Sequence, residues 1–409
     1  MNGLASIEWM SKRRLLVAVV ALMAAAAAFK LGDEFRRLLF ESRPDGAVDM
    51  HNLHRWVGLW FRGEPIFQKS NAALYPPATY IMLWPFLGWT SFAIARWIWA
   101  GAMVTGLTAT VLLILRASGA ETRIERIFVA LLVLSINGTG VAVGNGQLIL
   151  LILPAILAVT VLAERGTGSW VSDLAAAFLL TWAMVKPSVT LPFLWIFAIG
   201  PKHWRVGLFL ILIYLALNFI AASFQKEDLP TLVRSTLTRA STATTHFPGT
   251  RNVHALLVVT ALQRWLTLSS AIVFVALGAV ICFVRRANIW VLLGIAALVA
   301  RMWTYHRVYD DVLIALAELA LFQIAKRESS PVRRKIAGAL LLLLALAMLC
   351  PARFLDYSGL SWSSESIWIC AGIQTILWLS TLIFLVNYAR LDSKRTQETD
   401  GRVPQFATS

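Results

Sequence analysis

The fold is decided by residues 43–85, RPDGAVDMHNLHRWVGLWFRGEPIFQKSNAALYPPATYIMLWP, which follow the first apolar run of the chain. This stretch is the richest in charges and aromatic rings in a chain that is otherwise mostly apolar. Its last part begins a short apolar run at Tyr75. Whether that run crosses a membrane fixes the side on which every later loop lies.

The composition indicates a membrane protein built of helices. The chain has 409 residues, of which 58% are hydrophobic and only 14% charged. Long apolar runs recur along its whole length, and they are continuous rather than alternating, which favours helices over a barrel. The net charge is +15. In a membrane protein such a charge marks topology and contacts with membrane lipids, so no nucleic-acid partner is expected.

The first membrane span is expected at residues 15–31. It follows a polar N-terminus, residues 1–14, that ends in Lys12, Arg13 and Arg14. Basic residues favour the cytoplasmic side, so residues 32–90 form the first outer loop. The run also resembles a signal peptide, but an uncleaved anchor is preferred, and cleavage would leave the later topology unchanged.

Residues 75–89 allow two topologies. This apolar run is short and is broken by Pro76, Pro77, Pro85 and Gly88. If it crosses the membrane, the basic loops that follow lie outside. If it is a re-entrant or interfacial element, more than half of the 37 basic residues fall in cytoplasmic loops and tails. The positive-inside bias favours the second topology.

The resulting prediction is a single all-α integral membrane domain, residues 1–409, with about twelve transmembrane helices. Both termini are cytoplasmic, residues 224–268 form a long outer loop, and residues 389–409 form a cytoplasmic tail. The expected spans are residues 15–31, 91–115, 127–143, 148–163, 170–185, 188–200, 206–223, 269–284, 289–303, 311–325, 336–350 and 366–388. The chain is expected in an inner (plasma) membrane with its site facing the outside or periplasm.

Asp45 and Asp49 are the first candidates for chemistry. If the stretch is helical, their four-residue spacing places them on one face. A carboxylate desolvated at a membrane edge is suited to act as a general base. His51 lies close by and adds a proton-carrying group. The alternative is a solvated loop acid, or a partner for Arg43 or Arg55.

Further candidates lie in the other outer loops. Lys186 at a membrane edge either snorkels or binds a lipid phosphate. Residues 301–311 hold arginines, a histidine and acids, which are functional candidates by default; the alternative is a structural network, with Arg307 paired to Asp310 or Asp311. Residues 225–264 form either a lid over an anionic ligand or a solvated polar loop.

Several cofactor motifs are absent from the sequence. It contains no Walker motif, no dinucleotide fingerprint and no metal-ligand spacing, and no cytoplasmic domain to hold a nucleotide. A sugar donor carried on a membrane lipid would remove the need for a nucleotide. No cofactor and no metal are therefore expected.

The order of several short motifs resembles a known family. The motifs are Tyr75-Pro76-Pro77 before a short apolar run, Gly146-Gln147 opening a Leu-rich span, Lys186-Pro187 between two spans, Arg251-Asn252 in a late outer loop, and the cluster at residues 301–311. This order resembles the polyprenyl-phosphate-mannose-dependent mannosyltransferases of glycosyltransferase family 87, which have the GT-C membrane fold. The resemblance covers roughly residues 15–326.

The resemblance implies roles for individual residues. The family's catalytic base falls on Asp49, with Asp45 as the competitor. The donor phosphate would be stabilised by Lys186 together with Arg251, His306 or Arg307. Tyr75, Gln147 and Asn252 match further family positions, whereas His254 stands where a serine is common.

The function that the resemblance implies is inverting sugar transfer. Mannose would move from a polyprenyl-monophosphate donor to a lipid-linked glycan acceptor at the outer face. The rival hypotheses are a secondary transporter or lipid-carrier flippase, and a non-catalytic membrane scaffold. A transporter should keep its charges near the bilayer midplane. Here the ionisable groups gather on one face, which favours the enzyme.

Overall fold

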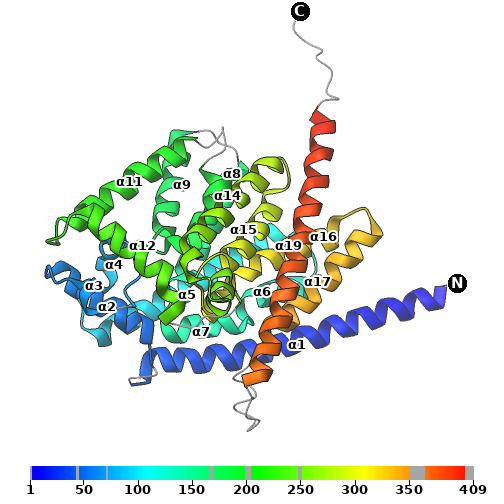
Figure 1. Cartoon of the computed structure of the whole chain (residues 1–409). Helices are drawn as coiled ribbons and strands as arrows, with labels where there is room; N and C mark the ends of the chain where they lie inside the picture. Colours follow the sequence, from blue (N-terminus) through cyan, green and yellow to red (C-terminus); the bar gives the residue numbers. More distant parts are fainter. Residues whose placement is uncertain are drawn as a thin grey trace, which may run out of the picture.

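The computed structural model describes residues 2–42, 46–70, 72–165, 169–198, 204–246, 251–349 and 364–400, and these are helical with no strand among them (Figure 1). The α-helices are α1 (Asn2–Phe40), α2 (Val48–Phe61), α3 (Ile66–Lys69), α4 (Pro77–Leu87), α5 (Phe92–Ser118), α6 (Arg123–Leu134), α7 (Asn137–Asn145), α8 (Ile149–Arg165), α9 (Trp170–Ala183), α10 (Pro187–Phe197), α11 (Trp204–Ala222), α12 (Leu229–His246), α13 (Val253–Val259), α14 (Leu266–Phe283), α15 (Ile289–Met302), α16 (Ile314–Arg327), α17 (Pro331–Leu349) and α19 (Ser364–Asp400). Two 3-10 turns, η1 (Gln263–Trp265) and η2 (Val308–Leu313), complete the set. The all-α fold class is confirmed.

The expected count of twelve crossings is not confirmed. Among the described residues, five helices are long and apolar enough to cross a membrane: Arg14–Phe40, Phe92–Ser118, Trp204–Ala222, Gln263–Phe283 and Ala371–Glu398. A sixth crossing is obtained if α6 and α7, which meet at a bend of 50°, form one span. Other expected spans, such as α10 and α15, are helices of 11 and 14 residues. At 1.5 Å per residue these are shorter than a bilayer core of roughly 30 Å.

Residues 75–89 form the short helix α4, which begins after Pro76 and has Pro77 in its first turn. Proline is favoured there because the first helical N–H groups need no partner. The helix has 11 residues, about half of what a crossing needs. It packs on α2 and α11, with the Tyr80 ring stacked on Trp60 at 4.4 Å. Its re-entrant or interfacial placement stays a prediction.

The first helix continues beyond its apolar run. It reaches Phe40, and its last turns carry a buried polar network against α7. Glu34 is fully buried and pairs with Lys30 at 3.0 Å and Arg37 at 2.5 Å. Arg37 also donates to the Asn145 side chain at 2.8 Å. The network joins the end of α1 to the α7–α8 turn, which carries Gln147.

The core lies around α15 and α16, where α16 is buried from Ile314 through Ile324. Three core helices connect the two ends of the bundle. These helices are α8, α15 and α16. Gln147 lies just before α8, Trp303 just after α15 and Asp310 just before α16, so all three residues lie at the same end of the bundle. These residues line one cavity together with residues of α2, α10 and α12.

Candidate active site

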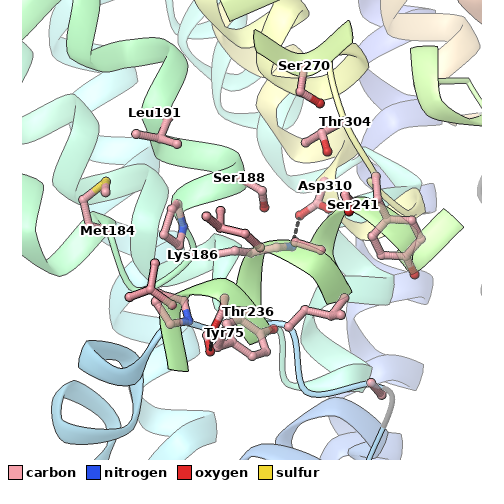
Figure 2. A pocket seen from close by; sticks show the side chains of 18 of the residues that line it. Tyr75, Met184, Lys186, Ser188, Leu191, Thr236, Ser241, Ser270, Thr304 and Asp310 are labelled. Atoms are coloured by element: carbon pink, nitrogen blue, oxygen red, sulfur yellow. Dashed lines mark hydrogen bonds and ion pairs between the residues drawn. The ribbon is translucent and has the colours of Figure 1, made fainter. Parts of the chain in front are cut away.

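A cavity of about 640 Å³ lies at this end of the bundle. Its lining is mostly apolar, with polar side chains from distant parts of the chain. Figure 2 shows the ion pair between Lys186 and Asp310, with Tyr75 and Thr236 on one side of it and Thr304 and Ser270 on the other. A mostly apolar pocket with a few convergent polar groups is typical of a ligand site.

Asp49 lies in the first turn of α2 and lines the cavity. Its Oδ2 accepts a hydrogen bond from Gln147 Nε2 at 2.6 Å. Burial raises the pKa of the Asp49 carboxyl above its ordinary value, although the Gln147 bond and the charges of Arg307 and Lys186 lower it. The side chain is only half-buried, so it remains open to the cavity. A carboxylate with a raised pKa that is open to a cavity is better suited to accept a proton than an ordinary surface carboxylate.

The Asp49–Gln147 contact depends on a tight turn at Gly146. This glycine has φ 70°, and a Cβ added to it would lie 2.5 Å from the Cβ of Met50. The turn is held by Trp99, whose indole N–H donates to the Gly146 carbonyl at 3.0 Å. On the α2 side, Ala47 has φ 50° and its N–H donates to the Gly144 carbonyl at 3.1 Å. Glycine is therefore needed at Gly146 for both its backbone conformation and the close approach of α2.

Lys186 is the residue before α10, and its ammonium group lies 2.7 Å from Asp310 Oδ1. The other oxygen of Asp310 lies 2.9 Å from His306 Nδ1. Lys186 also lies 4.9 Å from the centre of the Tyr309 ring. No acid lies near Lys186 in the sequence, so the structure adds a partner that the sequence does not reveal.

The two carboxylates of the cavity differ in their electrostatics. Burial by itself would raise the pKa of Asp310, but the charges of Lys186 and His306 lower it below its ordinary value. The pKa of Asp49 is raised instead. Asp310 is therefore a fixed anion, whereas Asp49 is the better proton acceptor. A pair of acids whose pKa values are moved apart is typical of an acid–base site.

Arg307 is an exposed cation that lines the same cavity. Among the described residues, its guanidinium makes neither a hydrogen bond nor an ion pair. The expected alternative pairing of Arg307 with Asp310 or Asp311 is wrong, because other cations occupy both acids. Arg301 Nε lies 2.5 Å from Asp311 Oδ1, and Arg251 lies 3.4 Å from Asp311 Oδ2.

Arg251 does not line the cavity. Besides Asp311, its guanidinium contacts the Gln374 side chain and lies over the Trp378 ring at 5.5 Å. Both residues belong to α19. The structure thus gives Arg251 contacts that join the loop before α13 to α19.

Three other expected site residues also lie behind the cavity lining. His306 is fully buried and contacts the site through Asp310. Asn252 caps α13 by accepting from the Ala255 N–H at 2.7 Å, and its amide donates to the His306 carbonyl at 3.4 Å. The ring of His51 packs on Phe92 at 4.7 Å.

Of the remaining expected residues, Tyr75 lines the cavity, and burial raises the pKa of its hydroxyl. Asp45, the competitor of Asp49, lies outside the described residues.

Some cavity residues were not predicted from the sequence. Asn52 follows Asp49 by three positions on α2 and lines the cavity with it; helical spacing would have found it. Thr236 and Tyr305 carry no motif that distinguishes them from solvated loop residues. Within the described ranges, no group of three or more His, Cys, Asp or Glu side chains is arranged to hold a metal ion.

A comparison with protein families shows to which family the chain belongs. The model of glycosyltransferase family 87 matches residues 73–325, more than half of the chain. The chain belongs to glycosyltransferase family 87. Neither the curated proteins nor the solved structures give a significant match.

Membership of glycosyltransferase family 87 makes this chain a glycosyltransferase, and its apolar helices make it an integral membrane protein. The matched residues include Tyr75, Gln147, Lys186 and Arg307 but begin after Asp49. The transporter hypothesis gains no support.

Proposed function

We propose that this protein is an inverting glycosyltransferase of the GT-C type that moves mannose from a polyprenyl monophosphate to a lipid-linked glycan. One observation carries the proposal: a single cavity holds a carboxylate with a raised pKa, Asp49, and a cation without a partner among the described residues, Arg307. Inversion in one step needs a base for the acceptor and positive charge for the leaving group.

Asp49 is the base in this proposal. The acceptor hydroxyl gives its proton to the Asp49 carboxylate as its oxygen bonds to the anomeric carbon of the sugar. The bond between that carbon and the phosphate oxygen breaks, and polyprenyl phosphate leaves with the electron pair. The Gln147 bond engages Oδ2, which leaves Oδ1 of Asp49 for the acceptor.

Arg307 and Lys186 receive the leaving phosphate. The guanidinium of Arg307 suits a phosphate because it offers two parallel N–H donors. Lys186 adds a positive charge whose position is fixed by Asp310. His306, Asn252 and Arg251 act as positioning residues, since none of them lines the cavity.

The apolar part of the cavity suits the polyprenyl chain. Leu191 of α10, Leu215 of α11 and Leu237 of α12 line it, so apolar surface lies beside the polar groups. A lipid-linked donor needs this combination, because its phosphate and its hydrocarbon bind in adjoining places. The site faces the outside in this proposal, as the distribution of basic residues indicates.

The test is sugar transfer by the purified full chain. Radiolabelled polyprenyl-phosphate mannose and extracted membrane glycolipids are supplied to the wild type, to Asp49→Asn and to Asp33→Asn. Asp33 is a matched control because it pairs with Arg36 on α1, at 3.3 Å, and does not line the cavity. We expect Asp49→Asn to lower the rate about 10²–10⁴-fold and Asp33→Asn to leave it unchanged.

Two outcomes would contradict the proposal in different ways. Unchanged transfer by Asp49→Asn excludes Asp49 as the base. Absence of transfer by the wild type from any lipid-linked sugar excludes the reaction itself.

A further inference from the structure

A second cavity, of about 250 Å³, lies at the opposite end of the bundle. It is formed where α5, α8 and α16 end and where α15 begins. We call it the arginine crevice; it is lined by Arg116, Ala117, Val161, Glu164, Asn288, Trp290, Gln323 and Arg327. Helix α8 has 17 residues and joins the two ends, so the crevice lies roughly 25 Å from the candidate active site.

The crevice contains two cations without partners. Arg116 and Arg327 are both exposed, and neither makes a hydrogen bond or an ion pair within the described part of the chain. The adjacent Lys326 behaves differently, since it pairs with Glu125 at 2.9 Å and Glu121 at 3.4 Å. The acid of the crevice, Glu164, accepts from the Trp290 indole N–H at 2.6 Å instead of from an arginine. The crevice is therefore left with a net positive charge.

Neighbouring backbone limits where the Arg327 guanidinium can lie. It lies against Gly119, which has φ 68°, and a Cβ at that position would collide with it. Gln323 donates to the Ala117 carbonyl at 2.8 Å, so the polar wall beside the arginines is fixed as well. Two guanidinium groups at a shaped polar cavity suit a ligand with several oxygen acceptors on one centre, which is the chemistry of a phosphate.

Helix α5 indicates where such a phosphate comes from. Arg116 lies one helical turn after Leu112, so the two side chains share a face of α5. Leu112 is 61% exposed, and α5 is one of the helices apolar enough to cross a membrane. A lipid chain that packs along Leu112 would therefore place its headgroup beside the Arg116 guanidinium. We propose that the arginine crevice binds the phosphate of an anionic lipid headgroup.

The simpler alternative is that these arginines only mark topology and stay solvated. Arg285 and Arg286, in the turn before α15, are exposed in the same way and do not line the crevice. They provide a matched control, because Arg285→Gln/Arg286→Gln removes the same charge as Arg116→Gln/Arg327→Gln.

Native mass spectrometry of the full chain in detergent tests the proposal. The protein is titrated with phosphatidylglycerol, with phosphatidylcholine and with glycerol phosphate. We expect phosphatidylglycerol to be retained in preference to phosphatidylcholine. The crevice variant should bind it about tenfold more weakly, and the Arg285→Gln/Arg286→Gln variant should bind it as the wild type does.

Equal weakening in both double variants, or none in the crevice variant, would overturn the proposal. Competition by glycerol phosphate at concentrations that match the lipid would show that the ligand is a soluble phosphate and overturn the lipid source. Thermal unfolding of each variant reports its folding, and single Arg116→Gln and Arg327→Gln variants give the same test if the double variant is unstable.

Discussion

Gln147 Nε2 donates to Asp49 Oδ2 at 2.6 Å, although the two residues lie 98 positions apart. This bond stabilises the ionised carboxylate and so lowers the pKa that burial raises. The sequence reveals neither the burial of Asp49 nor its hydrogen bond with Gln147, because both depend on residues that are distant in the chain. The bond joins α2 to the α7–α8 turn. Replacing Gln147 therefore tests experimentally what controls the ionisation of Asp49.

Replacing Gln147 by Met removes the donor but keeps the side-chain length. Without the hydrogen bond the pKa of Asp49 rises further, because burial remains. If Asp49 is the base, transfer requires its ionised carboxylate, so the acid limb of the pH profile should move to higher pH. The measurement is kcat/KM for sugar transfer against pH. Gln68→Met on α3, an exposed position, is the control, and an unmoved acid limb in Gln147→Met would contradict the assignment.

Replacing Gly146 by Ala tests the turn that positions Gln147. The new Cβ would meet Met50 at 2.5 Å, and alanine would have to adopt φ 70°. We expect a loss of about 1–2 kcal/mol in the free energy of unfolding and lower transfer. Thermal unfolding measures the first effect. Gly101→Ala on α5, where a Cβ would meet nothing within 4 Å, should lose neither stability nor transfer.

Replacing Arg307 by Gln removes the cavity cation that has no partner in the described chain. Because it forms no ion pair there, its loss should leave the melting temperature nearly unchanged. If it binds the leaving phosphate, kcat/KM for the lipid-phosphate donor should fall about 10²-fold. Arg234→Gln is the control, since Arg234 is exposed on α12 and does not line the cavity. Equal rates for the two variants would remove Arg307 from the site.

Much of the fold could be predicted from the sequence, because apolar runs and helix-breaking residues are local signals. The short helix α4 between Pro76 and Gly88 is an example. The number of crossings could not be predicted, because an apolar run does not reveal how its helix is buried. Helix α15 is apolar over 14 residues and lies in the core of the bundle. Protein around it can bury such a helix as well as lipid can.

The location of the candidate site was easier to predict from the sequence than the pairing of its charged residues. Asp49, Gln147, Lys186 and Arg307 all belong to segments that topology placed on one face, and they line one cavity. Ion pairs depend on tertiary contacts, so the sequence could not show that Asp311 would take Arg301 and Arg251 while Arg307 stayed apart. Two arginines and two acids within residues 301–311 allow several pairings, and only packing selects one.

The Lys186–Asp310 pair allows a structural role to be separated from a chemical one. Asp310 is 1% exposed, so Lys186→Met leaves a buried charge with only His306 beside it. We expect a loss of about 3–5 kcal/mol in the free energy of unfolding. The double variant Lys186→Met/Asp310→Asn removes both charges and should recover most of this loss. If Lys186 also binds the donor phosphate, the double variant should fold well yet still transfer sugar poorly.

The measurements are thermal unfolding and radiolabelled transfer. The control is Arg62→Gln, because Arg62 forms an exposed ion pair with Glu64 at 2.8 Å. An exposed pair of this kind contributes less than about 1 kcal/mol. Recovery of both stability and transfer in the double variant would make Lys186 purely structural and leave Arg307 as the phosphate-binding cation.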